Sequence, residues 1–171
     1  MKIRWVISIV SIALCTPAFA ETGRATLKGA AEGSPIAGTA TFTDSPDGLK
    51  VSVHVEHASP GTHGLHIHEF GLCDDLGKAA GGHFNPDHVK HGFLPHDGFA
   101  AAHAGDFGNI EVAPDGSGTV ELTLPGLTVT GGHYSVSGRA VVLHEHADDF
   151  GQPTGNAGGR IGCGSILVTK D

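Results

Sequence analysis

The sequence predicts an all-β fold in a single domain, and three of its features support this prediction. Short segments alternate apolar and polar residues with a period of two, as strands with one buried face do. The 27 glycines and 9 prolines are spread through the chain and separate these segments. The segments also lack the spacing of an amphipathic helix. Together these features indicate a β-sandwich or a β-barrel.

The clearest predicted strand covers residues 49–55. Its leucine and valines share one face and its polar side chains the other, so we expect one face to be buried and the other to contact water. Similar runs cover residues 25–28, 39–43, 120–124, 139–144 and 161–168, and Pro-Asp-Gly turns stand at 46–48 and 114–116. This spacing of strands and turns is typical of all-β domains.

Two segments, residues 71–107 and 145–159, break the strand pattern. Both are rich in Gly, His, Asp and Pro and have no sustained apolar period. Long loops without secondary structure are functional or disordered in compact domains. Because histidines and carboxylates concentrate in and beside these two loops, a functional role is favoured.

The first twenty residues have the organisation of a secretory signal peptide. They begin with two cations, continue with an apolar stretch over residues 5–14, and end in Ala-Phe-Ala. A membrane anchor is the rival interpretation, but this stretch is short for crossing a bilayer. We therefore expect a signal peptide at 1–20, a domain at 21–171, a periplasmic or otherwise secreted location, and no membrane attachment after cleavage.

The chain is acidic. The full sequence carries 10 Lys plus Arg and 18 Asp plus Glu, and cleavage would remove Lys2 and Arg4, leaving 8 − 18 = −10 with neutral histidines. This balance argues against nucleic acid as a partner. Cleavage would also remove Cys15 and leave Cys73 and Cys163, for which a disulfide is the default expectation in an oxidising compartment.

Histidines form the most specific pattern in the sequence, which contains 13 of them. His66 and His68 stand at i and i+2 in a strand-like segment, so both side chains project from one face as a chelating pair. The other candidate ligands are His83, His91, His103 and Asp106 in the first loop and His144 at the end of an apolar strand. Nitrogen-rich sets without sulfur suit copper(II) and zinc.

Several blocks of the sequence resemble the copper,zinc superoxide dismutase family and follow the order found there. They are GTHGLHIH at 61–68, GHFNP at 82–86, HG at 91–92, HAGDFGN at 103–109, GRAVVLHE at 138–145, ADDFG at 147–151 and TGNAGGRIGCG at 154–164. The resemblance implies a flattened eight-stranded Greek-key barrel of immunoglobulin-like sandwich architecture, with two long functional loops. It also implies an enzyme that converts superoxide to oxygen and hydrogen peroxide.

The resemblance further implies the metal ligands, with one copper ion and one zinc ion per subunit. Copper would be held by His66, His68, His83 and His144, and zinc by His83, His91, His103 and Asp106. His83 would then bridge the two metals and take part in catalysis. Copper would undergo the redox change, whereas zinc would order the loop.

Other positions receive roles from the same resemblance. Asp148 would bond to His66 and His91 and so link the two sites. Arg160 would be a catalytic group that attracts and orients the superoxide anion, and Thr154 would line the same channel. A Cys73–Cys163 disulfide would tie the first loop to the last strand. The resemblance leaves monomer and homodimer open.

The remaining polar residues have simpler interpretations. His63 is expected to be structural, as is Arg139. The histidines at 54, 57, 133 and 146 are expected to be solvated or locally bonded, since nothing pairs them with a donor set. Arg160 itself has the alternative of a surface salt bridge.

The chain also departs from the common family pattern. The stretch from His91 to His103 is long and contains His96, while His88 precedes it, and either could compete as a zinc ligand. The loop at 145–159 contains neither Lys nor Arg. Steering by this loop is therefore in doubt, and Lys78 and Lys90 are the next candidate cations. Two other functions stay open at this point: a periplasmic copper-binding or copper-delivery protein, and a zinc-bound structural domain that has lost copper.

Overall fold

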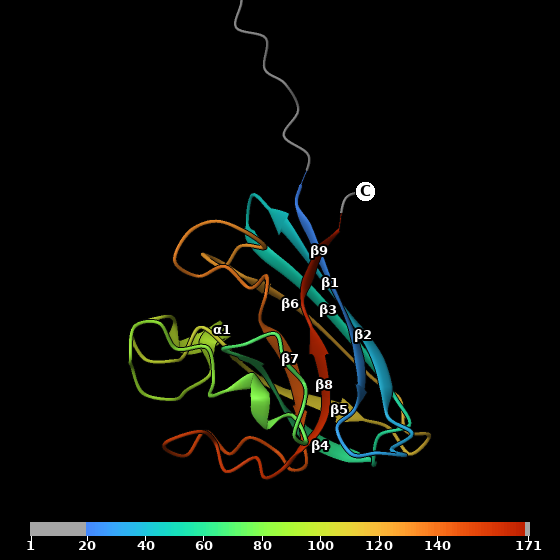
Figure 1. Ribbon diagram of the computed structural model, residues 1–171. Coiled ribbons are helices and arrows are strands. Elements are labelled where there is room, and N and C mark those ends of the chain that lie inside the picture. The colour runs from blue at the N-terminus through green and yellow to red at the C-terminus, as the bar shows by residue number, and fades with distance from the viewer. Residues whose placement is uncertain (1–19, 170–171) are drawn as a thin grey trace, which may run out of the picture.

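The computed structural model describes residues 20–169, which form one closed antiparallel β-barrel (Figure 1). Its strands are β1 (Thr22–Gly29), β2 (Ala37–Ser45), β3 (Gly48–Glu56), β4 (Gly61–His68), β5 (Asp106–Val112), β6 (Gly118–Leu124), β7 (Ala140–His144), β8 (Arg160–Ser165) and β9 (Leu167–Thr169). The sheet order is β2-β3-β6-β5-β4-β7-β8-β1, and pairing of β1 with β2 closes the barrel. The predicted eight-stranded barrel is confirmed. The short β9 follows β8 after Ile166 and pairs with β1.

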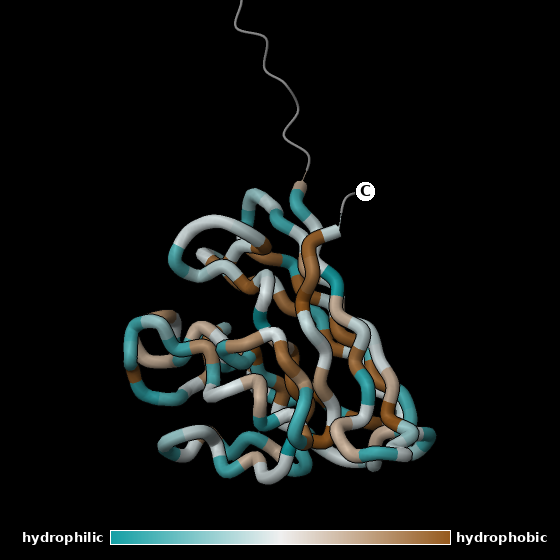
Figure 2. Tube along the Cα trace, in the orientation of Figure 1, coloured by the Kyte–Doolittle hydropathy of each residue, from teal (hydrophilic) through white to brown (hydrophobic). Residues whose placement is uncertain are grey.

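The predicted alternation matches the core of the barrel. In β3, Leu49, Val51, Val53 and Val55 are buried, and the residues between them are partly or fully exposed. Phe42 from β2 and Leu143 from β7 join them inside. Burying each such side chain contributes about 1.5–3 kcal/mol relative to leaving it exposed. Figure 2 shows apolar residues recurring along the strands, whereas the loop before β8 is mostly hydrophilic or neutral.

Strands β4 and β7 differ from the others because both of their faces are buried. In β4 every residue from His63 onward is buried, and so is the whole of β7. The cover on the outer face comes from the long loop between β4 and β5, which contains the short helices η1 (Lys78–Ala80) and α1 (Leu94–Asp97). The sequence placed residues 106–107 in this loop, but they belong to β5. Within residues 20–169, no helix is long and apolar enough to cross a bilayer.

A disulfide fastens the start of this loop to the barrel. Cys73 in the loop is bonded to Cys163 in β8, with Cα atoms 5.7 Å apart, and this confirms the expected pair. Around it, Ala80, Ala140 and Val142 form a small apolar cluster separate from the main core. The expected signal peptide falls on residues 1–19, which lie outside the described residues, and on Ala20 at their edge.

Candidate metal centre

Four buried histidines converge on the outer face of β4 and β7. His66 and His68 come from β4, His144 ends β7, and His83 from the loop is held beside His68 by an isolated β-bridge. One ring nitrogen from each of the four lies within 4.8 Å of the others. The i, i+2 spacing of His66 and His68 therefore gives the chelating pair that the sequence predicted.

A second set shares His83 and is built around one carboxylate. Oδ1 of Asp106 lies 2.9 Å from Nδ1 of His83 and 3.1 Å from Nδ1 of His103, and Oδ2 lies 2.9 Å from Nδ1 of His91. The backbone N–H groups of Gly92 and His103 donate to Oδ2 at 2.9 and 2.8 Å. Asp106 is thus fixed at the start of β5, with three imidazole nitrogens around it.

The free ring nitrogens show that these sets suit metal ions. His68 donates from Nδ1 to the carbonyl of Gly81 at 3.1 Å, so its Nε2 carries a lone pair, and this atom lies 3.3 Å from Nε2 of His144. Among residues 20–169, three buried side-chain atoms make no hydrogen bond of good geometry, and all are ring nitrogens: Nδ1 of His66, of His144 and of His91, the last of which lies 2.9 Å from Oδ2 of Asp106. Buried nitrogens without partners are costly unless a cation binds them. Neutral imidazoles at such spacing suit copper and zinc.

Asp148 connects the two sets from outside. Its Oδ2 accepts from Nε2 of His66 at 2.7 Å, and its Oδ1 accepts from Nε2 of His91 at 3.0 Å. Each donation comes from Nε2, so Nδ1 is the other nitrogen of each ring: in His66 it makes no hydrogen bond, and in His91 it lies 2.9 Å from Oδ2 of Asp106. Asn109 in turn exchanges two hydrogen bonds with the backbone of Asp148, at 2.7 and 3.0 Å. The carboxylate therefore fixes the orientation of both rings through Nε2, as supporting carboxylates do for metal-binding histidines.

Three of the histidines are held neutral. Burial lowers the pKa of His68 to about 2 and of His144 to about 3. Burial also lowers the pKa of His83 to about 4, although its hydrogen bond with Asp106 opposes the shift. Neutral imidazole is the form that binds metals, so these rings need not lose a proton from the imidazolium state first.

The carboxylates have the opposite effect on their neighbours. Burial acts to lower the pKa of His91, but its contacts with Asp106 and Asp148 outweigh burial and raise the pKa to about 9. Burial likewise acts to raise the pKa of Asp106, yet hydrogen bonds from His103, His83 and His91 lower that pKa well below its usual range. Asp106 is therefore ionised, which is the form in which a carboxylate binds zinc.

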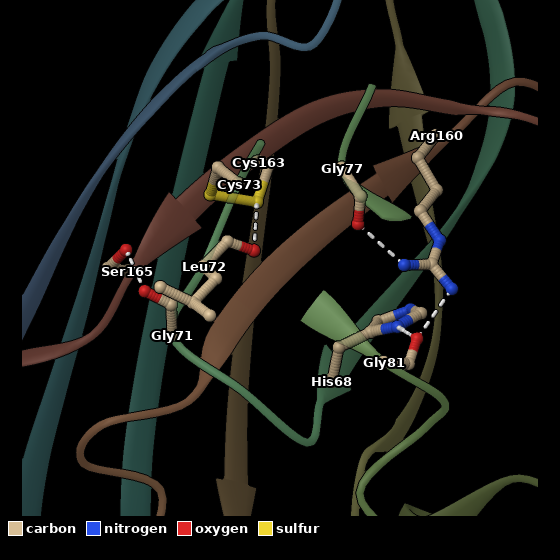
Figure 3. The surroundings of a disulfide bond; sticks show 9 residues. All are labelled: His68, Gly71, Leu72, Cys73, Gly77, Gly81, Arg160, Cys163 and Ser165. Atoms are coloured by element: carbon tan, nitrogen blue, oxygen red, sulfur yellow. Dashed lines mark hydrogen bonds between the residues drawn. A yellow bond between two sulfur atoms is a disulfide. The ribbon is translucent and has the colours of Figure 1, made fainter. Parts of the chain in front are cut away.

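A cavity of about 190 Å³ opens onto the first set and is lined by His68, His83, His144, Thr154 and Arg160 among others. Arg160, the first residue of β8, donates from Nη1 to the carbonyl of Gly77 and from Nη2 to that of Gly81, both at 2.6 Å (Figure 3). Among residues 20–169, Arg160 has no carboxylate partner, and its guanidinium is held by the loop that the disulfide fastens.

The other histidines and Arg139 lie as expected. His63 donates from Nδ1 to the carbonyl of His144 at 2.8 Å, and Arg139 bonds to the backbone and covers the ring of Phe84. The side chain of His96 is 83% exposed and pairs with Asp97. Within the described part of the chain, neither His88 nor His96 joins a ligand cluster. His54 and His133 bond locally to Thr119 and Asp87.

One brace at the site was not predicted from the sequence. Oε1 of Gln152 accepts from the backbone N–H of His91 at 3.1 Å, and its Nε2 donates to the carbonyl of His91 at 2.8 Å. The loop between β7 and β8 thereby holds a residue of the second set by its backbone. A lone glutamine in a polar loop carries no sequence signal of such a role.

Known proteins resemble this chain over nearly its whole length. The family model described as "Copper/zinc superoxide dismutase (SODC)" matches residues 36–166. The extracellular Cu-Zn superoxide dismutase of Caenorhabditis elegans is 38% identical, and the match covers 100% of this chain and 80% of the relative. The Cu-Zn superoxide dismutase of Deinococcus radiodurans is 37% identical over 93% of each chain.

A solved structure agrees with these relatives. The crystal structure of the clock protein EA4 has a TM-score of 0.77 and 36% identity, covering 90% of this chain and 98% of that one. The family model alone spans well over half of the chain. The chain therefore belongs to the copper/zinc superoxide dismutase family, whose cofactors are copper and zinc and whose members are oxidoreductases.

Proposed function

We propose that the chain is an exported superoxide dismutase in which copper is held by the first histidine set and zinc by the second. The copper ligands are His66, His68, His83 and His144, and the zinc ligands are His83, His91, His103 and Asp106. The observation that carries the proposal is that His83 belongs to both sets. Nδ1 of His83 faces Asp106 and the second set, which leaves Nε2 for the first set.

The residues of the chain have distinct tasks in the reaction, in which two superoxide ions and two protons give one oxygen and one hydrogen peroxide. When bound, copper would supply the one-electron change that this requires, and zinc would supply fixed positive charge that stabilises a deprotonated ring. His83 can hold a proton at Nε2 in one half of the cycle and release it in the other. Burial lowers the pKa of the His83 imidazolium to about 4, so the metal-free ring is neutral and its remaining proton is the one that takes part in this exchange.

Arg160 and Thr154 provide the route for the substrate. Both line the cavity over the first set. Nη1 and Nη2 of Arg160 each donate one hydrogen bond to a backbone carbonyl. Because the guanidinium has five N–H donors in all, donors remain for a small anion. The backbone bonds also fix the plane of the guanidinium, so it can orient as well as attract superoxide.

The proposed location is outside the cytoplasm, and in a bacterium this would be the periplasm. The signal-like residues 1–20 and the disulfide support export, because disulfides persist in oxidising compartments. Two relatives are named extracellular. N-terminal sequencing of the secreted protein tests this, and we expect Glu21 as the first residue.

Activity of the purified protein tests the function itself. Superoxide decay after pulse radiolysis should be fast with copper and zinc bound, and should return to the uncatalysed rate in the zinc-only protein and in a His144→Ala variant. His54→Ala, which changes a partly exposed histidine of β3 outside both ligand sets, is the matched control. A copper- and zinc-loaded protein without activity would favour copper delivery over catalysis.

A further inference from the structure

We propose that Tyr134 and Asp87 form a clamp that shapes the zinc loop, residues 83–103, before any metal binds. The clamp joins this loop to the segment 125–139, which connects β6 to β7. Tyr134 donates its hydroxyl hydrogen to Oδ2 of Asp87, and its ring stacks on that of Phe99. Tyr134 is thus a positioning residue for zinc, and the inference rests on the zinc ligands proposed above.

The first contact of the clamp lies between two zinc ligands. Asn85 donates from Nδ2 to the carbonyl of Val89 at 2.9 Å and accepts the N–H of Val89 at 3.1 Å, which closes residues 85–89 into a turn. Asp87 stands at the tip of this turn, four residues from His83 and four from His91. Holding Asp87 therefore fixes the position of the turn and so the directions of the two segments on either side of it, one leading to His83 and the other to His91.

The second contact lies on the other half of the zinc loop. The rings of Phe99 and Tyr134 are 3.8 Å apart between centroids and 7° from parallel. Phe99 follows α1 and stands four residues before His103. One tyrosine therefore braces both halves of the zinc loop, on either side of His91. The stretch 91–103 that carries Phe99 is the one whose length departs from the common family pattern.

The clamp has a rigid base. Val129 and Val136 are fully buried in the main core, and the backbone N–H of Val129 donates to Oδ1 of Asp44 in β2 at 2.8 Å. His133, next to Tyr134, adds a second bond to Asp87 at 2.8 Å. These contacts need no metal, so the zinc loop is already partly ordered before zinc binds. It then loses less conformational entropy when zinc binds, and such preorganisation raises the affinity for zinc.

The experiment compares metal affinities of the full chain. Zinc and copper dissociation constants are measured by chelator competition for wild type, Tyr134→Leu, Tyr134→Phe and Asp87→Ala, and cobalt(II) spectra report the geometry of the zinc site. Thr119→Val is the matched control. It removes a side-chain hydrogen bond between Thr119 in β6 and His54 in β3, neither of which belongs to the clamp or to a ligand set. We expect Tyr134→Leu and Asp87→Ala each to raise the zinc dissociation constant about tenfold. This is the lower end of the loss in metal affinity seen when residues that support metal ligands are replaced. Tyr134→Phe keeps the stacking and should weaken zinc about threefold, the effect of one hydrogen bond.

The outcomes separate the clamp from the zinc assignment. The clamp is supported if the variants bind zinc more weakly while their copper affinity is unchanged. It is also supported if the cobalt(II) spectrum changes in Tyr134→Leu and changes less in Tyr134→Phe. Zinc affinity equal to that of Thr119→Val, or an equal loss for both metals, overturns it. Asp87 is exposed, so Asp87→Ala decides the question if Tyr134→Leu does not fold. If His103→Ala leaves zinc binding intact, the proposed zinc site itself is wrong, and the clamp fails with it.

Discussion

Arg160, the first residue of β8, lines the cavity over the first histidine set, in a chain whose net charge is −8. At about 0.1 M salt the screening length is about 10 Å, so near cations outweigh distant repulsion. The loop between β7 and β8 has no Lys or Arg between residues 145 and 159. At the residue scale, Arg160 should therefore supply an unusually large share of the attraction for superoxide.

Reversing this charge should change both the rate and its salt dependence. In wild type, kcat/KM should fall as ionic strength rises, whereas in Arg160→Glu it should drop by about one to two orders of magnitude and rise with added salt. Arg24→Glu makes the same charge change at an exposed position of β1 and serves as the control. Pulse radiolysis at low and high salt measures both slopes. Unchanged slopes in Arg160→Glu would assign steering to other cations, with Lys78 and Lys90 next.

At the scale of elements, the disulfide-fastened loop joins stability to the geometry of the site. Cys73 and Cys163 are 90 residues apart in the sequence, and the chain-entropy model gives about 4.6 kcal/mol as the upper stabilisation. The same loop supplies the carbonyls of Gly77 and Gly81 that hold Arg160. Reduction should therefore lower the free energy of unfolding by a few kcal/mol and also lower kcat/KM.

Denaturant titration and activity of Cys73→Ser measure these two effects separately. The positioning role predicts that the folded variant loses rate in conditions where it is fully folded. A variant that is less stable but equally active when folded would leave the disulfide with a stabilising role alone.

The elements also show what sequence reasoning could and could not predict. Strands with one solvent-exposed face, such as β3, were predicted because their alternation of apolar and polar residues reflects burial directly. Strands β4 and β5 lack this alternation, since the loops bury their outer faces, and β5 was missed. Residue types and spacing indicated only the candidate ligands, whereas their division into two sets came from the resemblance to the superoxide dismutase family. The contacts of Gln152 and Tyr134 depend on how loops pack, which no local pattern encodes.

For the whole molecule, the histidines make the stability of the metal-free protein depend on pH in both directions. His68, His83 and His144 have pKa values of about 2, 4 and 3, below the unfolded value of 6.5, so their stabilisation is complete above pH 6.5 and is lost as the pH falls. His91, with its pKa raised to about 9, stabilises the fold below pH 6.5, and this is lost as the pH rises through 9. Unfolding free energies in urea should therefore peak near pH 6.5 to 7. A flat profile between pH 4 and 6.5 would refute the buried, neutral histidines.

Metal content and metal affinity of the histidine variants test the shared-ligand site most directly. Elemental analysis after reconstitution should give one copper and one zinc per chain. In competition titrations, His103→Ala should weaken zinc and spare copper, His144→Ala should weaken copper and spare zinc, and His83→Ala should weaken both, while His54→Ala changes neither. An active, copper-saturated protein without zinc affinity, or a His83→Ala variant that loses only one metal, would contradict the account.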